Sequence, residues 1–161
     1  MHQNHPRANY LIKLGVIIVN KEFIIMDEDN FYEVNENEIN DVENELNIQF
    51  PKELRSFYLK CGYGFLGNSE SNINRIMDPL SVRDFRLRQN DFEFYPDIEL
   101  YDQFENGKLI FFEANETALI SIELTDSEKS KIYYYDTPIA ESLSDFLEKL
   151  RDNEEYYLDL I

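Results

Sequence analysis

Three glycines in the segment CGYGFLG, residues 61–67, match the G-x-G-x-x-G spacing of a dinucleotide-binding turn. In such a turn a strand precedes the first glycine and a helix follows the last one, so that the phosphates meet the amino end of the helix. Here the order is reversed, because a helical pattern runs into Gly62 and no helical pattern begins at Gly67. We therefore interpret Gly62 as the end of a helix, where glycine tolerates a left-handed backbone conformation, and we expect no cofactor.

A second pattern with chemical potential is acidic. Asp27, Asp29 and Glu38 occupy the first, third and last places of a possible calcium loop. However, Phe31 and Tyr32 fill the places where an oxygen ligand and the turn glycine are needed. We interpret this segment as a solvated connection and predict no metal site.

Covalent catalysis would need a nucleophile with a base beside it. Cys61, the only cysteine, falls on the apolar face of a predicted helix and is expected to be structural. The only histidines, His2 and His5, lie in a tail of residues 1–9 that we expect to be mobile. We therefore predict no catalytic residue, and a hydrolase with a carboxylate pair stays an alternative that abundant carboxylates neither favour nor exclude.

Helical patterns dominate the first half of the chain. We expect a first helix over residues 10–19, with its apolar residues on one face. Asn35 followed by Glu38 has the form of a capping box at the start of a helix that continues to about residue 47. Pro51 suits the first position of the next helix. That helix has a continuous buried stripe at helical spacing: Leu54, Phe57, Tyr58 and Cys61.

Strand patterns dominate the second half, after a short predicted helix over residues 81–89. Three strands joined by short loops are expected over residues 108–113, 117–124 and 131–136, and the middle one alternates as a strand with one face in the core. A closing amphipathic helix is marked by Ile139, Leu143, Phe146, Leu147 and Leu150. This order predicts an α+β fold: a single domain with a mainly antiparallel sheet flanked by N-terminal helices and a C-terminal helix.

The charge balance limits the class of partner. The chain has 161 residues, and 33 acidic residues against 15 basic ones give a formal net charge of -18. So negative a protein disfavours binding to nucleic acid or to an anionic membrane, whereas it attracts a basic protein and accelerates their encounter. The competing explanation is that the acidic surface only keeps the protein soluble. With a single cysteine, no signal-peptide pattern and no stretch of membrane-spanning length, we expect a cytoplasmic protein.

The acidic–aromatic segment, residues 90–107 (NDFEFYPDIELYDQFENG), combines carboxylates and aromatic rings without one basic residue. Aromatic residues anchor protein interfaces, and carboxylates complement arginine-rich partners. The structural alternative is an edge strand and loop whose aromatics pack inward, and we expect the nearby Arg75, Arg83, Arg86 and Arg88 to compensate acids within the fold. The candidate partner-binding residues are Glu93, Tyr95, Asp97, Glu99, Tyr101 and Asp102.

The segment INDVENELNIQFPKELRSFYLKCGYGFL, residues 39–66, resembles the signature of the SUKH superfamily, in which a helix ending in E-x-x-L-x-I runs into L-P-x-x-[FY] and a glycine pair. The later segment IYYYDTPIAESLSDFLEKL, residues 132–150, resembles the closing strand and helix of the family. On this resemblance, residues 1–161 form one SUKH-like domain with a core over about residues 36–151. The residues that match the family motif are structural: Pro51, Leu54, Phe57, Gly62 and Gly64.

This resemblance implies a protein-binding role. Bacterial members are mostly immunity proteins that bind and block toxin domains, frequently nucleases, and a relative regulates cell-wall synthesis in yeast. We therefore expect an immunity-type protein that binds a cognate basic toxin through the acidic–aromatic segment. A small-ligand-binding or regulatory module without a toxin partner stays the alternative, and the oligomeric state is left open.

Overall fold

The fold is built around a seven-stranded antiparallel sheet. The computed structural model describes residues 12–13, 16–19 and 22–161. In that part of the chain the strand order of the large sheet is β10-β9-β8-β7-β6-β5-β4, and a small sheet has the order β1-β2-β3. The strands are β1 (Ile12–Lys13), β2 (Val16–Val19), β3 (Phe23–Met26), β4 (Asn30–Tyr32), β5 (Tyr63–Phe65), β6 (Arg75–Ile76), β7 (Lys108–Asn115), β8 (Ala118–Glu123), β9 (Ile132–Tyr134) and β10 (Thr137–Ala140).

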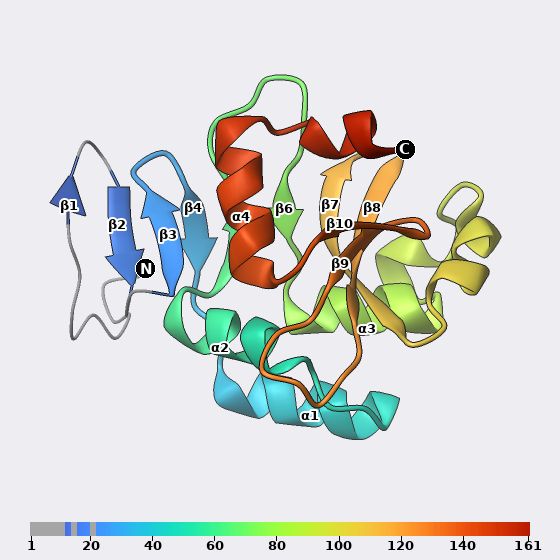
Figure 1. Cartoon of the computed structure of the whole chain (residues 1–161). Helices are drawn as coiled ribbons and strands as arrows, with labels where there is room; N and C mark the ends of the chain where they lie inside the picture. Colours follow the sequence, from blue (N-terminus) through green and yellow to red (C-terminus); the bar gives the residue numbers. More distant parts are fainter. Residues whose placement is uncertain (1–11, 14–15, 20–21) are drawn as a thin grey trace.

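The helices surround this sheet as the α+β prediction requires. Figure 1 shows α4 in front of the sheet, α1 and α2 below it, and the small sheet at one side. Helix α3 packs against β7 and α1. The α-helices are α1 (Glu36–Leu46), α2 (Lys52–Lys60), α3 (Pro79–Leu87) and α4 (Leu143–Asp152), and the 3₁₀ helices are η1 (Asn90–Phe92), η2 (Ile98–Phe104) and η3 (Tyr156–Leu160). The predicted α+β class is confirmed.

The predicted helix over residues 10–19 is wrong. Within that range the structure has two strands, β1 and β2, and β2 pairs with β3 in an antiparallel register that places Ile17 opposite Ile25. Val16–Val19 is a run of four β-branched residues, which lose side-chain freedom in a helix and pack well on a pleated surface. Residues 1–9, predicted to be a mobile tail, lie outside the described residues.

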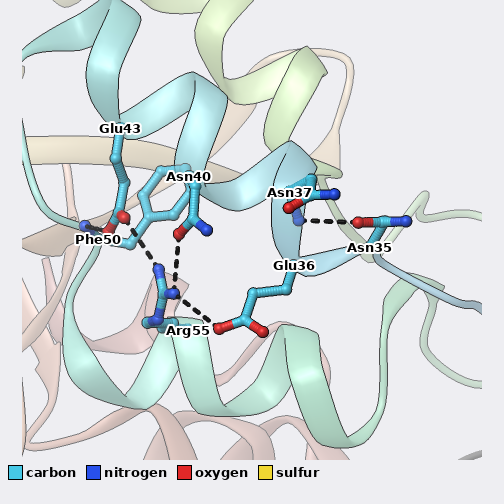
Figure 2. Close-up of polar contacts among 7 residues, drawn as sticks. All are labelled: Asn35, Glu36, Asn37, Asn40, Glu43, Phe50 and Arg55. Atoms are coloured by element: carbon cyan, nitrogen blue, oxygen red, sulfur yellow. Dashed lines mark hydrogen bonds and ion pairs between the residues drawn. The ribbon is translucent and has the colours of Figure 1, made fainter.

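A polar network joins α1 to α2 (Figure 2). The guanidinium of Arg55 donates to Glu43 Oε1 at 2.9 Å and to Asn40 Oδ1 at 3.0 Å. Its Nη2 also lies 3.3 Å from Glu36 Oε2, and the second oxygen of Glu43 accepts the backbone N–H of Phe50 at 2.7 Å. One arginine therefore fixes both helices and the loop between them.

The capping prediction for α1 is confirmed in its first half. Asn35 is the N-cap, and its side chain accepts the backbone N–H of Asn37 at 2.8 Å. The Glu38 carboxylate interacts with the backbone of Leu80 at the start of α3 rather than returning to Asn35. Pro51 is the N-cap of α2, one position before the predicted one.

The buried stripe of α2 forms the centre of the core, as predicted. Leu54, Phe57, Tyr58 and Cys61 are all buried, and the ring of Phe57 meets those of Phe23 and Phe31 edge-on at 5.0 and 5.6 Å. The hydroxyl of Tyr58 donates to the Met77 carbonyl at 2.6 Å. The N-terminal strands, α2 and the segment before α3 are thereby joined.

Two predictions in the second half need correction. In β8 the residues from Ala118 to Ile122 are all buried, so both faces of the strand are covered rather than one. Ile139 belongs to β10 and not to the closing helix, although it is buried beside it. The rest of the predicted stripe is correct, because Leu143, Phe146, Leu147 and Leu150 all point into the core from α4.

Candidate partner-binding surface

The acidic–aromatic segment folds as two short 3₁₀ helices, η1 and η2, and not as the edge strand of the structural alternative. In Figure 1 it forms the yellow loops that project beside β7, β8 and α3. Phe92, Ile98 and Tyr101 turn inward and are buried, whereas the carboxylates of the segment are mostly exposed. The 3₁₀ turns therefore direct these three apolar side chains inward, whereas Phe94 stays exposed with the acids.

An aromatic cluster anchors this segment to the domain. The ring of Phe85 in α3 meets Phe92, Tyr95 and Tyr101 edge-on at centroid distances of 5.1, 6.1 and 5.8 Å. Such edge-to-face pairs stabilise beyond the burial of their area. The candidate surface is thus held on a rigid base.

Three tyrosine hydroxyls converge on the turn between β7 and β8. Tyr95 donates to the Glu116 carbonyl at 2.8 Å, and Tyr101 and Tyr135 donate to the Thr117 carbonyl at 3.3 and 3.1 Å. Burial, with the carboxylates of nearby acids, raises the pKa of Tyr95, and burial raises the pKa of Tyr101 further. Both hydroxyls therefore stay protonated at neutral pH and keep donating.

The charges of the segment divide into compensated and free ones. Arg88 lies 2.7 Å from the Asp102 carboxylate and 2.8 Å from that of Glu105, so these two charges are offset. Four exposed carboxylates form no ion pair with any described residue: Asp91, Glu93, Asp97 and Glu99. Free negative charge is therefore concentrated on η1, on the first turn of η2 and on the loop between them.

The prediction that the arginine cluster compensates acids within the fold is confirmed for three members. Arg75 lies 2.7 Å from Glu113, Arg83 lies 2.9 Å from Asp84, and Arg88 pairs as described above. Arg86 instead donates to the carbonyl of Lys108 at 2.8 Å. All four arginines therefore interact with groups of the same chain, and together they form no unpaired basic patch.

A cavity of about 510 Å³ opens between the segment, the β7–β8 turn and the turn that follows β9. Three of the candidate residues line it, namely Tyr95, Asp97 and Tyr101, while Glu93, Glu99 and Asp102 do not. We call this cavity the tyrosine groove. Its remaining lining residues are Ile73, Pro96, Leu100, Glu113, Glu116, Thr117 and Tyr135.

Sequence reasoning missed Tyr135 and Glu116. The two lie in segments assigned to strands and their short connections, and no local pattern links them to Tyr95 or Tyr101. The ring of Tyr135 stacks on that of Tyr101 at 6.0 Å with an interplanar angle of 23°. The only sequence signal was the run of three tyrosines at residues 133–135, which exceeds what a short strand buries on one face.

The interpretation of the possible calcium loop, residues 27–38, as a solvated connection is wrong in part, because the segment contains β4 and the start of α1 and buries the Asp29 side chain. Asp29 accepts both ends of the Arg151 guanidinium at 2.6 and 2.8 Å, and its side chain is 1% exposed. Cys61 is buried, and among the described residues no three His, Cys, Asp or Glu side chains are arranged to hold a metal ion. His2 and His5 lie outside the described residues. In the described part of the chain, no helix is both long and apolar enough to cross a membrane.

Comparison with known families identifies the class of this domain. A family model described as SMI1-KNR4 cell-wall, in the SUKH group, matches residues 36–147. Since this match covers more than half of the sequence, the chain belongs to the SUKH family.

A particular relative is also similar over most of its length. The chain is 63% identical over 134 residues to a Bacillus subtilis (strain 168) protein named immunity protein YxxD, and the match covers 83% of this chain and 91% of that protein. No solved structure gives a significant match.

Proposed function

We propose that this chain is an immunity protein that binds a cognate toxin domain and neutralises it. The observation that carries the proposal is the 63% identity to a protein named as an immunity protein, over 91% of that protein's length. The membership of the SUKH family over residues 36–147 agrees with it. On this proposal the chain acts by binding, without catalysis, in the cytoplasm of the cell that makes it.

The charge distribution supports a basic partner. The net charge is -18, and four exposed carboxylates of residues 90–107 form no ion pair with any described residue. A field of this sign accelerates association with a basic protein and suppresses binding to nucleic acid. We therefore propose that the toxin presents a positively charged surface to residues 90–107.

Co-expression tests the proposed function. The toxin domain encoded beside this chain should arrest growth when expressed alone, and co-expression of the chain should restore growth. The purified pair should form a complex that survives gel filtration. Unchanged toxicity with the chain in excess would contradict the pairing.

A charge-reversal variant tests the proposed surface. Changing Glu93, Asp97, Glu99 and Asp102 together to Lys should slow association with the toxin and flatten the dependence of its rate on salt. The matched control reverses four exposed acids elsewhere, which changes the net charge equally: Asp41, Asp126, Glu148 and Asp159. Equal slowing by both variants would mean that only the overall field matters and that the surface lies elsewhere.

The tyrosine groove supports a second candidate, a module that binds a small ligand. Its volume of about 510 Å³ falls within the range of ligand pockets. A ligand that binds only the folded state raises the melting temperature. Stabilisation by a metabolite panel, in a chain that does not neutralise its neighbouring toxin, would favour this candidate.

A further inference from the structure

We propose that the tyrosine groove receives an arginine side chain from the toxin, which makes it the anchor of the complex. This inference rests on the proposed immunity function for the source of the arginine, and on the geometry of the groove for the chemistry. It narrows the binding site from the whole acidic–aromatic segment to one cavity.

The floor of the groove is aromatic, and its tyrosine hydroxyls already have hydrogen-bond acceptors within the chain. Tyr95, Tyr101 and Tyr135 place their hydroxyls on the carbonyls of Glu116 and Thr117. Because those donors are engaged, the rings offer the groove mainly their apolar and π-electron surfaces. A planar guanidinium stacks on such rings and is more weakly hydrated than an ammonium, which favours arginine over lysine.

The rim of the groove carries the complementary charge. Asp97, the N-cap of η2, and Glu116, in the β7–β8 turn, line the groove from two separate segments, and both are exposed. Neither forms an ion pair with a described residue, unlike Glu113, which is held by Arg75 at 2.7 Å. Two free carboxylates above an aromatic floor suit a cation that enters from solvent.

The surroundings of the groove favour a protein over a free small cation. Phe94 is 87% exposed and Leu100 is 56% exposed, and Leu100 itself lines the groove. Exposed apolar side chains around a pocket that binds an anchor residue are what a protein interface uses to exclude water. A toxin surface that presents this arginine would cover Leu100 as the arginine enters the groove.

A peptide probe tests the groove without the toxin. Acetyl-Gly-Arg-Gly-amide, titrated into the ¹⁵N-labelled protein, should shift the amide signals of Tyr95, Asp97, Glu116 and Tyr135 in a saturable manner. The matched peptide with citrulline, which keeps the shape but has no charge, should shift them far less. Equal shifts with both peptides, or shifts located elsewhere, would overturn the inference.

Amide variants test the rim without disturbing the fold. Asp97 has a left-handed backbone conformation with φ of 56°, which asparagine accepts readily, so Asp97→Asn should fold normally. The double variant with Glu116→Gln should bind the arginine peptide with an affinity lower by about fivefold or more. Glu148→Gln, an exposed carboxylate on α4 outside the groove, is the control and should change nothing.

The toxin completes the test and separates the two proposals. The double variant with Tyr135→Ala added should bind the toxin about tenfold more weakly or worse, mainly through faster dissociation. If the unaltered chain neutralises the toxin and this triple variant does so with equal affinity, the groove inference fails and the immunity function stands. If the arginine peptide occupies the groove while the unaltered chain does not bind the toxin, the immunity function fails and the groove belongs to another basic protein.

Discussion

Gly62 and Gly67 share a positive φ, at 99° and 69°, but only one of them is in a crowded place. A Cβ built on Gly62 would lie 1.9 Å from the carbonyl oxygen of Tyr32, whereas one built on Gly67 meets nothing within 4 Å. The C-cap of α2 is Cys61, one position before the predicted Gly62, and the missing side chain of Gly62 lets β4 approach the backbone directly. Gly64 in β5 serves the same close approach, because a Cβ there would lie 2.2 Å from the carbonyl oxygen of Asn30 in β4.

Alanine substitutions at these two glycines separate backbone strain from crowding. Gly67→Ala should lower the free energy of unfolding by about 1 kcal/mol, the cost of a left-handed conformation for alanine. Gly62→Ala should lower it by about 3 kcal/mol or more, because β4 must also move away. Urea denaturation measures both, and equal losses would show that the contact with Tyr32 relaxes freely.

Residue types in one segment predicted part of the candidate site. Tyr95, Asp97 and Tyr101 were identifiable because aromatic and acidic residues interleave locally in residues 90–107. Tyr135 and Glu116 were not, since they reach the groove through strand pairing between β7, β8 and β9. Strand pairing is a long-range property that no single window of sequence contains.

At the scale of elements, Glu53 joins α2 to α4. Its side chain is buried and accepts the backbone N–H groups of Ser130, Leu143 and Ser144 at 3.2, 3.0 and 3.4 Å. Leu143 and Ser144 are the first residues of α4, whose N–H groups have no partner within the helix. A carboxylate there also complements the positive end of the helix dipole.

Removing the Glu53 carboxylate should loosen α4. Glu53→Ala leaves three N–H groups without this acceptor, two of them buried, and should cost about 3 kcal/mol in the free energy of unfolding. Glu53→Gln keeps one acceptor oxygen and should cost about 1 kcal/mol. Native-state hydrogen exchange should show the amides of Leu143 and Ser144 exchanging first. The control Glu128→Ala removes an exposed partner of Lys52 and should cause no measurable change, and a loss as large as that of Glu53→Ala would contradict the capping role.

The sequence predicted those elements whose local pattern agrees with their packing. The stripes of α2 and α4 repeat at helical spacing over more than two turns, and the same residues fill the core. The helix predicted for residues 10–19 was wrong because their apolar positions match a helical face and a β-branched strand equally. The pairing of β2 with β3 decides between the two structures. Strands β4 and β6 have only three and two residues, so their partners in the sheet define them rather than any pattern of their own.

At the scale of the whole molecule, the excess of acids should make stability depend on pH. Burial, and then the nearby Asp78 carboxylate, raises the pKa of Glu38 above its ordinary value of 4.5. Burial also raises the pKa of Glu105, although Arg88 opposes the shift. A carboxyl whose pKa is higher in the folded chain than in the unfolded one contributes stability that is fully present below its ordinary pKa and is lost as the pH rises through the folded value.

The free energy of unfolding should therefore be larger at about pH 5.5 than at about pH 7.5, and added salt should reduce the difference by screening the net charge of -18. Glu38→Gln should raise stability at the higher pH and flatten the dependence, because it removes a carboxylate that faces Asp78. Asp41→Asn removes one exposed charge from the same helix and is the matched control. Urea denaturation across this pH range measures all three proteins, and identical curves for the two variants would show that general charge repulsion, rather than the position of Glu38 between α1 and α3, sets the pH dependence.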